Sequence, residues 1–233
     1  MPESVRASPP LQALFPAGAF VAETRDPGDP RLLFPEEAAC LGRAVPKRAQ
    51  EFAAGRLCAR RALAEFGIVD FPIIAAPDRQ PVWPASLVGS ITHSGGLAAA
   101  VAASRAVIAA IGIDSERADA VGEDIWPTIC APGEWSWVQS LPADGQRTAV
   151  ALLFSAKEAF YKCQYPLTRE WLDFHDLCLR PSQWGGARSA FTVHPTRRLA
   201  IEAYGPAPWT GNYLFHEGFV TAGVALPAMP GYQ

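Results

Sequence analysis

The chain has 233 residues, 49% of them apolar, and a formal net charge of -3 at pH 7. A chain of this length can bury a proper core, as one domain or as two small halves. The weak negative charge gives no wholesale attraction to nucleic acid or to an anionic membrane surface, so an anion site has to be built from a few local cations. We therefore expect neither nucleic acid nor a membrane as a partner.

Five cysteines are scattered along the chain, and none of them forms a Cys-x-x-Cys pair. An odd and unpaired set is typical of reduced thiols in a cytosolic protein, and its spacing does not predict a structural zinc site. The N-terminus has no signal-peptide pattern, and no apolar run approaches the length that spans a membrane. The sequence therefore predicts a cytoplasmic protein.

Prolines punctuate residues 1–34, where the pattern predicts an extended lead-in with a short strand at 19–23. Pro35 can open a short helix, and a longer helix is predicted over 46–66 because proline favours the first helical position and Gly67 follows the end. The sequence then becomes β-rich, and strands are predicted at 87–92, 97–103 and 107–115.

The second half of the chain repeats this order of elements. A helix is predicted over 144–164, and strands follow near 176–180, 188–194, 198–204 and 212–225. No sequence repeat is evident, so the similarity concerns the order of elements alone. A junction near 110–118 divides the chain into two expected α+β halves, residues 1–110 and residues 111–233.

Two carboxylates, Asp114 and Glu116, stand two residues apart at the end of an apolar strand. Residues at this spacing share one face of a strand, and close carboxylates repel each other unless a proton or a cation lies between them. A hard divalent cation such as Mg²⁺ is their natural partner. Glu158 lies near the apolar border of the predicted helix and could add a third carboxylate, although Glu158 and Lys162 could equally form a solvated surface pair.

Candidate anion contacts lie in the first half. Arg48 and Arg56, at one edge of the predicted long helix, could clamp a phosphate, whereas Arg56 and Arg60 could instead cover the edge of the core with their aliphatic stems. His93 stands in a strand that runs into Gly95-Gly96 and has hydroxyls on both sides, which is typical of a phosphate-contacting edge. A lone histidine in such a place is nevertheless usually structural.

Other conspicuous residues are interpreted as structural. No Ser-His-Asp order and no nucleophile elbow are present, so hydrolytic acyl chemistry has no support. Six tryptophans are expected to be core or interface anchors: Trp126, Trp135, Trp137, Trp171, Trp184 and Trp209.

Four blocks, in this order and spacing, resemble the phosphopantetheinyl transferases of the surfactin and enterobactin type. The blocks are Lys47-Arg48 with Glu51-Phe52-x-x-Gly55-Arg56-x-x-x-Arg60, Ser90-Ile91-Thr92-His93-Ser94, Gly112-Ile113-Asp114-Ser115-Glu116, and Phe154-Ser155-Ala156-Lys157-Glu158-Ala159-Phe160-Tyr161-Lys162. The resemblance implies an α+β fold with two similar helix-plus-antiparallel-sheet halves in a pseudo-twofold arrangement. It also implies an active site at the interface of the halves.

The resemblance implies roles for individual residues in the second half. Asp114, Glu116 and Glu158 would bind Mg²⁺, with the carbonyl of Ser115 as a further ligand. As a further or an alternative role, Glu158 would take the proton from the attacking serine hydroxyl. The two lysines of the last block, Lys157 and Lys162, would add positive charge near the leaving group.

For the first half, the resemblance implies contacts with coenzyme A. Thr92 and His93 would contact its phosphates, and Arg48 and Arg56 would hold its 3′-phosphate end. Arg79 stands where the family often has a basic residue beside the nucleotide.

The implied reaction moves the 4′-phosphopantetheine arm of coenzyme A to a serine of an apo acyl or peptidyl carrier protein and releases 3′,5′-adenosine bisphosphate. Mg²⁺ would be the cofactor, and the enzyme is expected to be a monomer. Leu172 and Phe174 are candidates for an exposed carrier-facing surface. Two alternatives stay open: a non-catalytic sensor or assembly protein that binds coenzyme A or a nucleotide, and a metal-dependent phosphohydrolase. The carrier and its pathway are left open.

Overall fold

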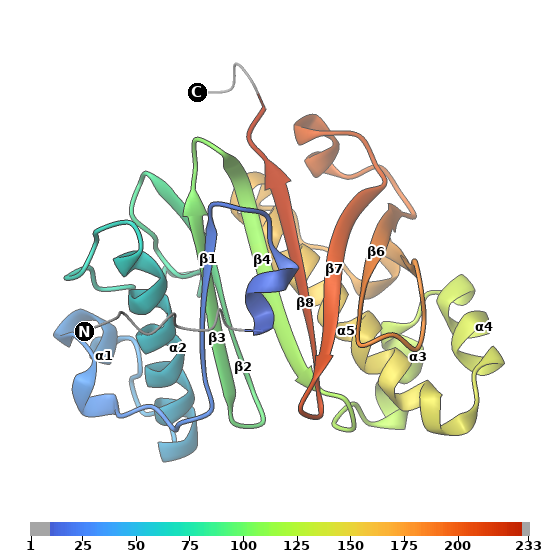
Figure 1. Ribbon diagram of the computed structural model, residues 1–233, viewed down its shortest axis with the longest axis horizontal. Coiled ribbons are helices and arrows are strands. Elements are labelled where there is room, and N and C mark those ends of the chain that lie inside the picture. The colour runs from blue at the N-terminus through green and yellow to red at the C-terminus, as the bar shows by residue number, and fades with distance from the viewer. Residues whose placement is uncertain (1–9, 230–233) are drawn as a thin grey trace, which may run out of the picture.

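The computed structural model describes residues 10–229, in which two antiparallel sheets stand side by side (Figure 1). One sheet has the strand order β1-β3-β2 and the other β4-β8-β7-β6-β5. The first contains β1 (Ala19–Thr24), β2 (Leu87–Ser94) and β3 (Leu97–Ser104). The second contains β4 (Ile108–Arg117), β5 (Leu177–Pro181), β6 (Arg188–Pro195), β7 (Trp209–His216) and β8 (Phe219–Pro227).

A long helix packs on each sheet, which confirms the predicted α+β fold of two similar halves. The α-helices are α1 (Pro35–Ala39), α2 (Pro46–Ala64), α3 (Trp126–Ile129), α4 (Pro132–Ser140) and α5 (Ala143–Thr168). The short 3₁₀ helices are η1 (Pro10–Leu14), η2 (Pro30–Leu32), η3 (Glu123–Ile125), η4 (Phe174–Asp176) and η5 (Ala200–Tyr204). Helix α2 covers β1, β2 and β3, whereas α5 lies against β4 and β8.

Most predicted elements are confirmed, but two in the second half are wrong. The predicted strand at 198–204 is instead η5 (Ala200–Tyr204) with the residues that lead into it, because the Glu202 carboxylate accepts the N–H of Leu199 and starts a helical turn. The run 212–225 contains two strands, since Glu217 and Gly218 both have positive φ and form a two-residue hairpin turn. Helices α3 and α4 were not predicted.

Helix α5 approaches β4 so closely that only glycine fits at position 112. A Cβ atom there would stand 2.0 Å from the carbonyl oxygen of Ala159. The contact is reinforced by the hydroxyl of Ser155, which donates to the carbonyl of Asp114 at 2.8 Å. The carboxylates of β4 and the middle turns of α5 are therefore fixed relative to each other.

The two sheets meet where β2 lies beside β4, and we call this line of contact the seam. Backbone hydrogen bonds do not join the two strands; side-chain hydroxyls of β2 do. The N–H of Ile113 donates to Ser90 Oγ at 3.2 Å, and the N–H of Ser115 donates to Thr92 Oγ1 at 3.0 Å. Alternate residues of β2 thus reach the backbone of β4. The chain passes between the sheets in the turn before β4, so the expected boundary at 110/111 falls inside that strand.

Residues 10–15 pack across both sheets on the side opposite to the long helices. Leu11, Leu14 and Phe15 belong to a buried cluster that includes residues of β1, β3 and β4. Phe15 also contacts β8, because a Cβ atom on Gly223 would stand 2.6 Å from its ring. Such burial of an aromatic side chain is worth about 2–3 kcal/mol and ties the two halves together.

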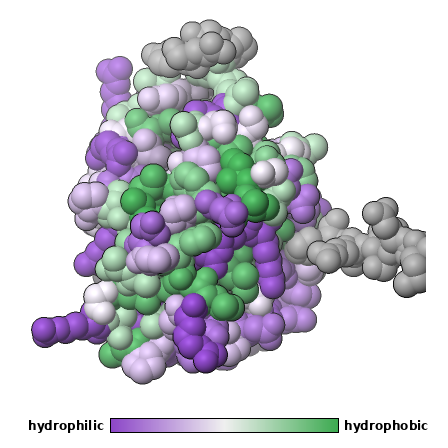
Figure 2. Space-filling view, turned by 90° about the vertical axis from the view of Figure 1, so that its left-hand side faces the viewer, coloured by the Kyte–Doolittle hydropathy of each residue, from purple (hydrophilic) through white to green (hydrophobic). Residues whose placement is uncertain are grey.

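All five cysteines are free thiols. Within residues 10–229, no helix combines the length and the apolar character needed to cross a membrane. On the face formed by α1 and α2, apolar residues lie in separate groups among polar ones (Figure 2).

Candidate functional site

The site is built around Asp114 in the middle of the seam. Its Oδ1 accepts a 2.6 Å bond from the Lys162 ammonium of α5 and a 3.3 Å bond from Thr92 Oγ1 of β2. Its Oδ2 is buried and has no hydrogen-bond partner. Burial raises the pKa of this carboxyl, and the nearby lysine opposes that rise. An unpartnered buried carboxylate oxygen is costly unless a further cation or donor reaches it.

Burial and the charge of Asp114 raise the pKa values of Glu116 and Glu158. Burial, followed by repulsion from Asp114, raises the pKa of Glu116 to about 7, and the hydroxyl of Ser94 donates to its Oε2 at 2.7 Å. Burial and then the same repulsion also raise the pKa of Glu158. Three carboxylates from β4 and α5 therefore share one region of negative potential, with Lys162 as the cation that partly offsets it.

The chemistry of these donors fits a hard divalent cation, because all three are carboxylates and one oxygen is buried without a partner. Within the described part of the chain, however, no group of three or more His, Cys, Asp or Glu side chains is arranged so that it could hold a metal ion. The ammonium of Lys162, and not a third carboxylate, is in contact with Asp114.

The side-chain hydroxyls of Ser115 and Thr92 are both engaged in hydrogen bonds within the protein. Ser115 alternates to the other face of β4, where its hydroxyl hydrogen-bonds with that of Thr221 at 2.8 Å. Thr92 is buried, and its hydroxyl is already engaged with the backbone of β4 and with Asp114. Thr92 therefore holds the seam and orients Asp114 in this structure.

Arg48 and His93, expected at different parts of coenzyme A, lie side by side in the structure. The guanidinium of Arg48 contacts Nε2 of His93, and the carboxylate of Glu51 is 3.7 Å from each side chain. Burial, followed by repulsion from Arg48, lowers the pKa of His93 to about 4. The ring is therefore neutral at pH 7, and a bound anion would favour its charged form.

Arg56 is largely structural. Its Nε donates to the carbonyl of Ile73 at 2.7 Å, and its guanidinium lies 3.9 Å from the centre of the Phe52 ring. Burial lowers the pKa of this buried arginine to about 10. These contacts with the Ile73 carbonyl and the Phe52 ring agree with the alternative in which Arg56 covers the edge of the core.

Lys157 differs most from its expected place. Its ammonium is buried and donates three hydrogen bonds, to the carbonyl of Ile129, to Glu134 Oε2 and to the carbonyl of Phe174, at 2.7–2.8 Å. An ammonium has three donors, so each of its N–H groups is engaged away from the carboxylates of the seam.

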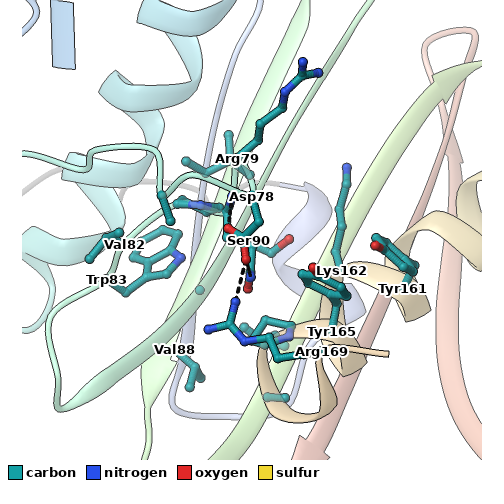
Figure 3. A pocket seen from close by; sticks show the side chains of 18 of the residues that line it. Asp78, Arg79, Val82, Trp83, Val88, Ser90, Tyr161, Lys162, Tyr165 and Arg169 are labelled. Atoms are coloured by element: carbon teal, nitrogen blue, oxygen red, sulfur yellow. Dashed lines mark hydrogen bonds and ion pairs between the residues drawn. The ribbon is translucent and has the colours of Figure 1, made fainter. Parts of the chain in front are cut away.

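A cavity of about 500 Å³, here called the seam cavity, opens beside Lys162. Figure 3 shows Trp83 and Val82 on one wall, and Tyr161 and Tyr165 of α5 on the other. Its remaining lining includes Arg79, Asp78, Arg105, Ser90 and Arg169. A salt bridge of 2.6 Å between Arg169 and Asp78 joins the two walls (Figure 3). Aromatic walls with several cations are suited to a nucleotide.

A second cavity of about 290 Å³, here called the α5 cavity, lies on the other side of Tyr161 and Trp171, which line both cavities. Its other lining residues are Thr128, Lys157, Glu158, Leu172, Asp173, Phe174 and Leu177. Glu158 thus faces the α5 cavity and Lys162 the seam cavity, so the charged centre lies between the two.

Two expectations for residues 171–174 need correction. Trp171 is 75% exposed and touches Tyr161 edge-on, so of the two expected roles the core anchor is wrong and the interface anchor stays a prediction, in contrast to buried Trp126 and Trp209. Leu172 is buried, so it cannot offer an exposed carrier surface, whereas Phe174 is half-buried and packs on Phe154.

Sequence reasoning missed Ser94, Ser155 and the tyrosines of α5 as parts of the site. Ser94 could have been found, since Ser90, Thr92 and Ser94 form a period-two row of hydroxyls along one predicted strand. Ser155 could not have been found in this way, because a single serine within a predicted helix does not indicate a hydrogen bond to another segment.

Comparison with known proteins covers nearly the whole chain. Residues 36–103 match the family described as 4′-phosphopantetheinyl transferase N-terminal domain, and residues 110–210 match the 4′-phosphopantetheinyl transferase superfamily. The chain is 38% identical over 232 residues to 4′-phosphopantetheinyl transferase Svp of Streptomyces mobaraensis, covering 95% of this chain and 91% of that protein.

Two further relatives match shorter stretches. The chain is 40% identical over 148 residues to 4′-phosphopantetheinyl transferase PptT of Mycobacterium tuberculosis, covering 61% of this chain and 62% of that one. Enterobactin synthase component D of Escherichia coli is 38% identical over 133 residues, with 56% and 62% covered. Among solved structures, Thermotoga maritima holo-[acyl-carrier-protein] synthase aligns with a TM-score of 0.38 at 20% identity, over 53% of this chain and 65% of that one.

Proposed function

Because this chain belongs to the 4′-phosphopantetheinyl transferases, which transfer phosphopantetheine from coenzyme A to carrier proteins, we propose that its acceptor is a serine of an apo acyl or peptidyl carrier protein. The reaction depends on Mg²⁺ and releases 3′,5′-adenosine bisphosphate. The observation that carries the Mg²⁺ dependence is the buried, unpartnered Oδ2 of Asp114, with Glu116 and Glu158 near enough that repulsion from Asp114 adds to burial in raising their pKa values.

The two cavities suit the two ends of coenzyme A. The nucleotide fits the seam cavity, where Arg79 and the aromatic walls of Trp83 and Tyr165 offer charge and stacking surfaces. The uncharged phosphopantetheine arm fits the α5 cavity, whose lining is mostly apolar. The pyrophosphate then lies between the cavities, next to Lys162 and Glu158.

The carboxylates of Asp114, Glu116 and Glu158 do not form a ready three-ligand cluster in the described structure, so they would have to draw together to hold Mg²⁺. Bound there, the ion would offset negative charge on the pyrophosphate, which is its usual contribution to phosphoryl transfer. Lys162 adds a fixed positive charge at the same place. Arg48 and His93 would bind the 3′-phosphate end, where a neutral ring can gain a proton beside an anion.

Glu158 is the proposed base that removes the proton from the serine hydroxyl. It is the one carboxylate of the three that comes from α5 and lines the α5 cavity. The pKa of Glu158 is raised, mainly by burial, and so is shifted towards the working pH, which is the direction that favours a general base.

The test is a carrier-loading reaction with coenzyme A, Mg²⁺ and apo carrier proteins of the acyl and peptidyl type, followed by intact mass spectrometry. The parent protein should add one phosphopantetheine arm to the carrier. Product formation without any carrier would instead support a phosphohydrolase, and tight coenzyme A binding without transfer would support a sensor.

Glu158→Gln tests the base directly. We expect transfer to fall by about 100-fold or more, the usual contribution of a general base, whereas the affinity for coenzyme A measured by calorimetry changes little. If Glu158→Gln loads the carrier as fast as the parent, Glu158 is not the base, but the phosphopantetheinyl transferase activity would still stand.

A further inference from the structure

The buried pair Lys157–Glu134 has a counterpart in the first half of the chain. Glu37 and Arg60 are 23 residues apart and form a 2.6 Å ion pair; Glu134 and Lys157 are also 23 residues apart and form a 2.7 Å ion pair. Both glutamate side chains are completely buried. Each cation stands at the same position counted from the start of its long helix, α2 or α5.

The two glutamates make matching bonds to the backbone. Each is the third residue of a short helix that begins with proline, and its Oε2 accepts the N–H of the residue before that proline, from Phe34 to Glu37 and from Ala131 to Glu134. The Oε1 atoms accept an N–H from the segment that follows the long helix, which is Ile73 in the first half and Leu179 in the second.

The two cations match as well. Arg60 donates to the carbonyl of Leu32 at 3.0 Å, and Lys157 donates to the carbonyl of Ile129 at 2.8 Å. Each of these carbonyls precedes the paired glutamate by the same number of residues. The four contacts thus recur in both halves, although the surrounding sequences show no evident repeat.

One bond has no counterpart. Lys157 also donates to the carbonyl of Phe174 at 2.8 Å, and Phe174 lines the α5 cavity. The next residue along α5 is Glu158, which lines the same cavity. In the second half the shared pair therefore fixes the cavity wall at Phe174 relative to the proposed base.

We propose that Lys157 is a positioning residue: with Glu134 it forms a buried structural pair, duplicated in the first half as Arg60–Glu37, that holds the wall of the α5 cavity. Its ammonium does not touch the phosphates. The effect on coenzyme A rests on the proposed function, since it requires the phosphopantetheine arm in the α5 cavity.

Amine labelling of the parent protein tests the burial of Lys157 without any variant. The chain has three lysines, Lys47, Lys157 and Lys162. We expect Lys157 to resist an amine-selective reagent in the folded protein with and without coenzyme A, while Lys162 reacts and is protected by coenzyme A. Labelling of Lys157 that coenzyme A suppresses would overturn the proposal.

Binding measurements on variants test the positioning role. In Lys157→Met and Glu134→Gln, the dissociation constant for coenzyme A should rise by about tenfold, a change of roughly 1.4 kcal/mol. The affinity for 3′,5′-adenosine bisphosphate, which lacks the arm, should stay within about twofold. A lysine that contacts the phosphates would instead weaken both ligands in Lys157→Met and neither in Glu134→Gln, and that pattern would refute the proposal.

The first half supplies the matched controls. Arg60→Met and Glu37→Gln remove the equivalent pair, so they should lower the melting temperature while leaving the ratio of the two dissociation constants unchanged. A parent protein that binds coenzyme A but loads no carrier would contradict the proposed function and not the burial of Lys157.

Discussion

His93 shows how strongly the surroundings of one residue set its chemistry. Burial of the ring and repulsion from Arg48 and Lys162 lower the pKa of His93 to about 4, and the carboxylate of Glu51 opposes this shift. Since the unfolded value is near 6.5, the unfolded chain binds more protons between pH 4 and 6.5. This residue therefore contributes stability that is present above pH 6.5 and is lost as the pH falls towards 4.

Ligand binding should reverse the shift at His93. An anion beside the ring favours the imidazolium, so we expect the His93 pKa, followed by NMR titration, to be about 4 in the free protein and clearly higher with 3′,5′-adenosine bisphosphate. The affinity for this nucleotide should then increase as the pH falls from 7 to 5. A ring pKa that the nucleotide leaves unchanged would place the nucleotide phosphates elsewhere.

At the scale of elements, the packing of α5 on β4 sets the spacing of the carboxylates. The helix was predictable from its apolar pattern, and so was the strand with Asp114 and Glu116. Their approach was not, because it depends on the absence of a side chain at Gly112, which in the sequence alone reads as one more glycine in an apolar run. Likewise, Lys157 and Lys162 look equivalent in the sequence, but only Lys162 faces Asp114.

Gly112→Ala should test this approach. The added methyl group would overlap the Ala159 carbonyl and push α5 away, which costs about 1–3 kcal/mol as overpacking usually does. We expect a lower melting temperature and slower carrier loading. Gly145→Ala, in α5 itself, is the control, since apart from the backbone of its own helix the added Cβ would have no neighbour nearer than 3.9 Å. Equal effects of both substitutions would argue against a special role for the close contact.

At the scale of the whole molecule, the two halves are joined along the seam by side chains. The order of elements and the two-half plan could be predicted from the sequence, because proline, glycine and apolar periodicity mark the elements. The cross-connections could not, because the row of hydroxyls that includes Ser90 and Thr92 is visible in the sequence but the strand whose N–H groups it meets is not. Residues 10–15, which belong to the predicted extended lead-in, pack against both sheets through Phe15.

Thr92→Val should weaken the seam. Valine keeps the shape but leaves the N–H of Ser115 buried without an acceptor, at a cost of about 1–3 kcal/mol. We expect a lower free energy of unfolding in denaturant titrations and reduced loading, because Asp114 also loses a donor. Thr92→Ser keeps the hydroxyl and should remain close to the parent. A stable and active Thr92→Val protein would show that the seam does not need this bond.

The central claim is that the carboxylates of the seam hold the Mg²⁺ on which transfer depends. The most direct measurement is the rate of carrier loading by metal-depleted protein as Mg²⁺ is added back, for the parent and for Asp114→Asn. The account predicts no loading without Mg²⁺, saturable recovery for the parent, and a recovery for Asp114→Asn that requires at least tenfold more Mg²⁺, in line with the loss of a charged ligand. Full activity of the metal-depleted parent, or identical Mg²⁺ curves for both proteins, would contradict it.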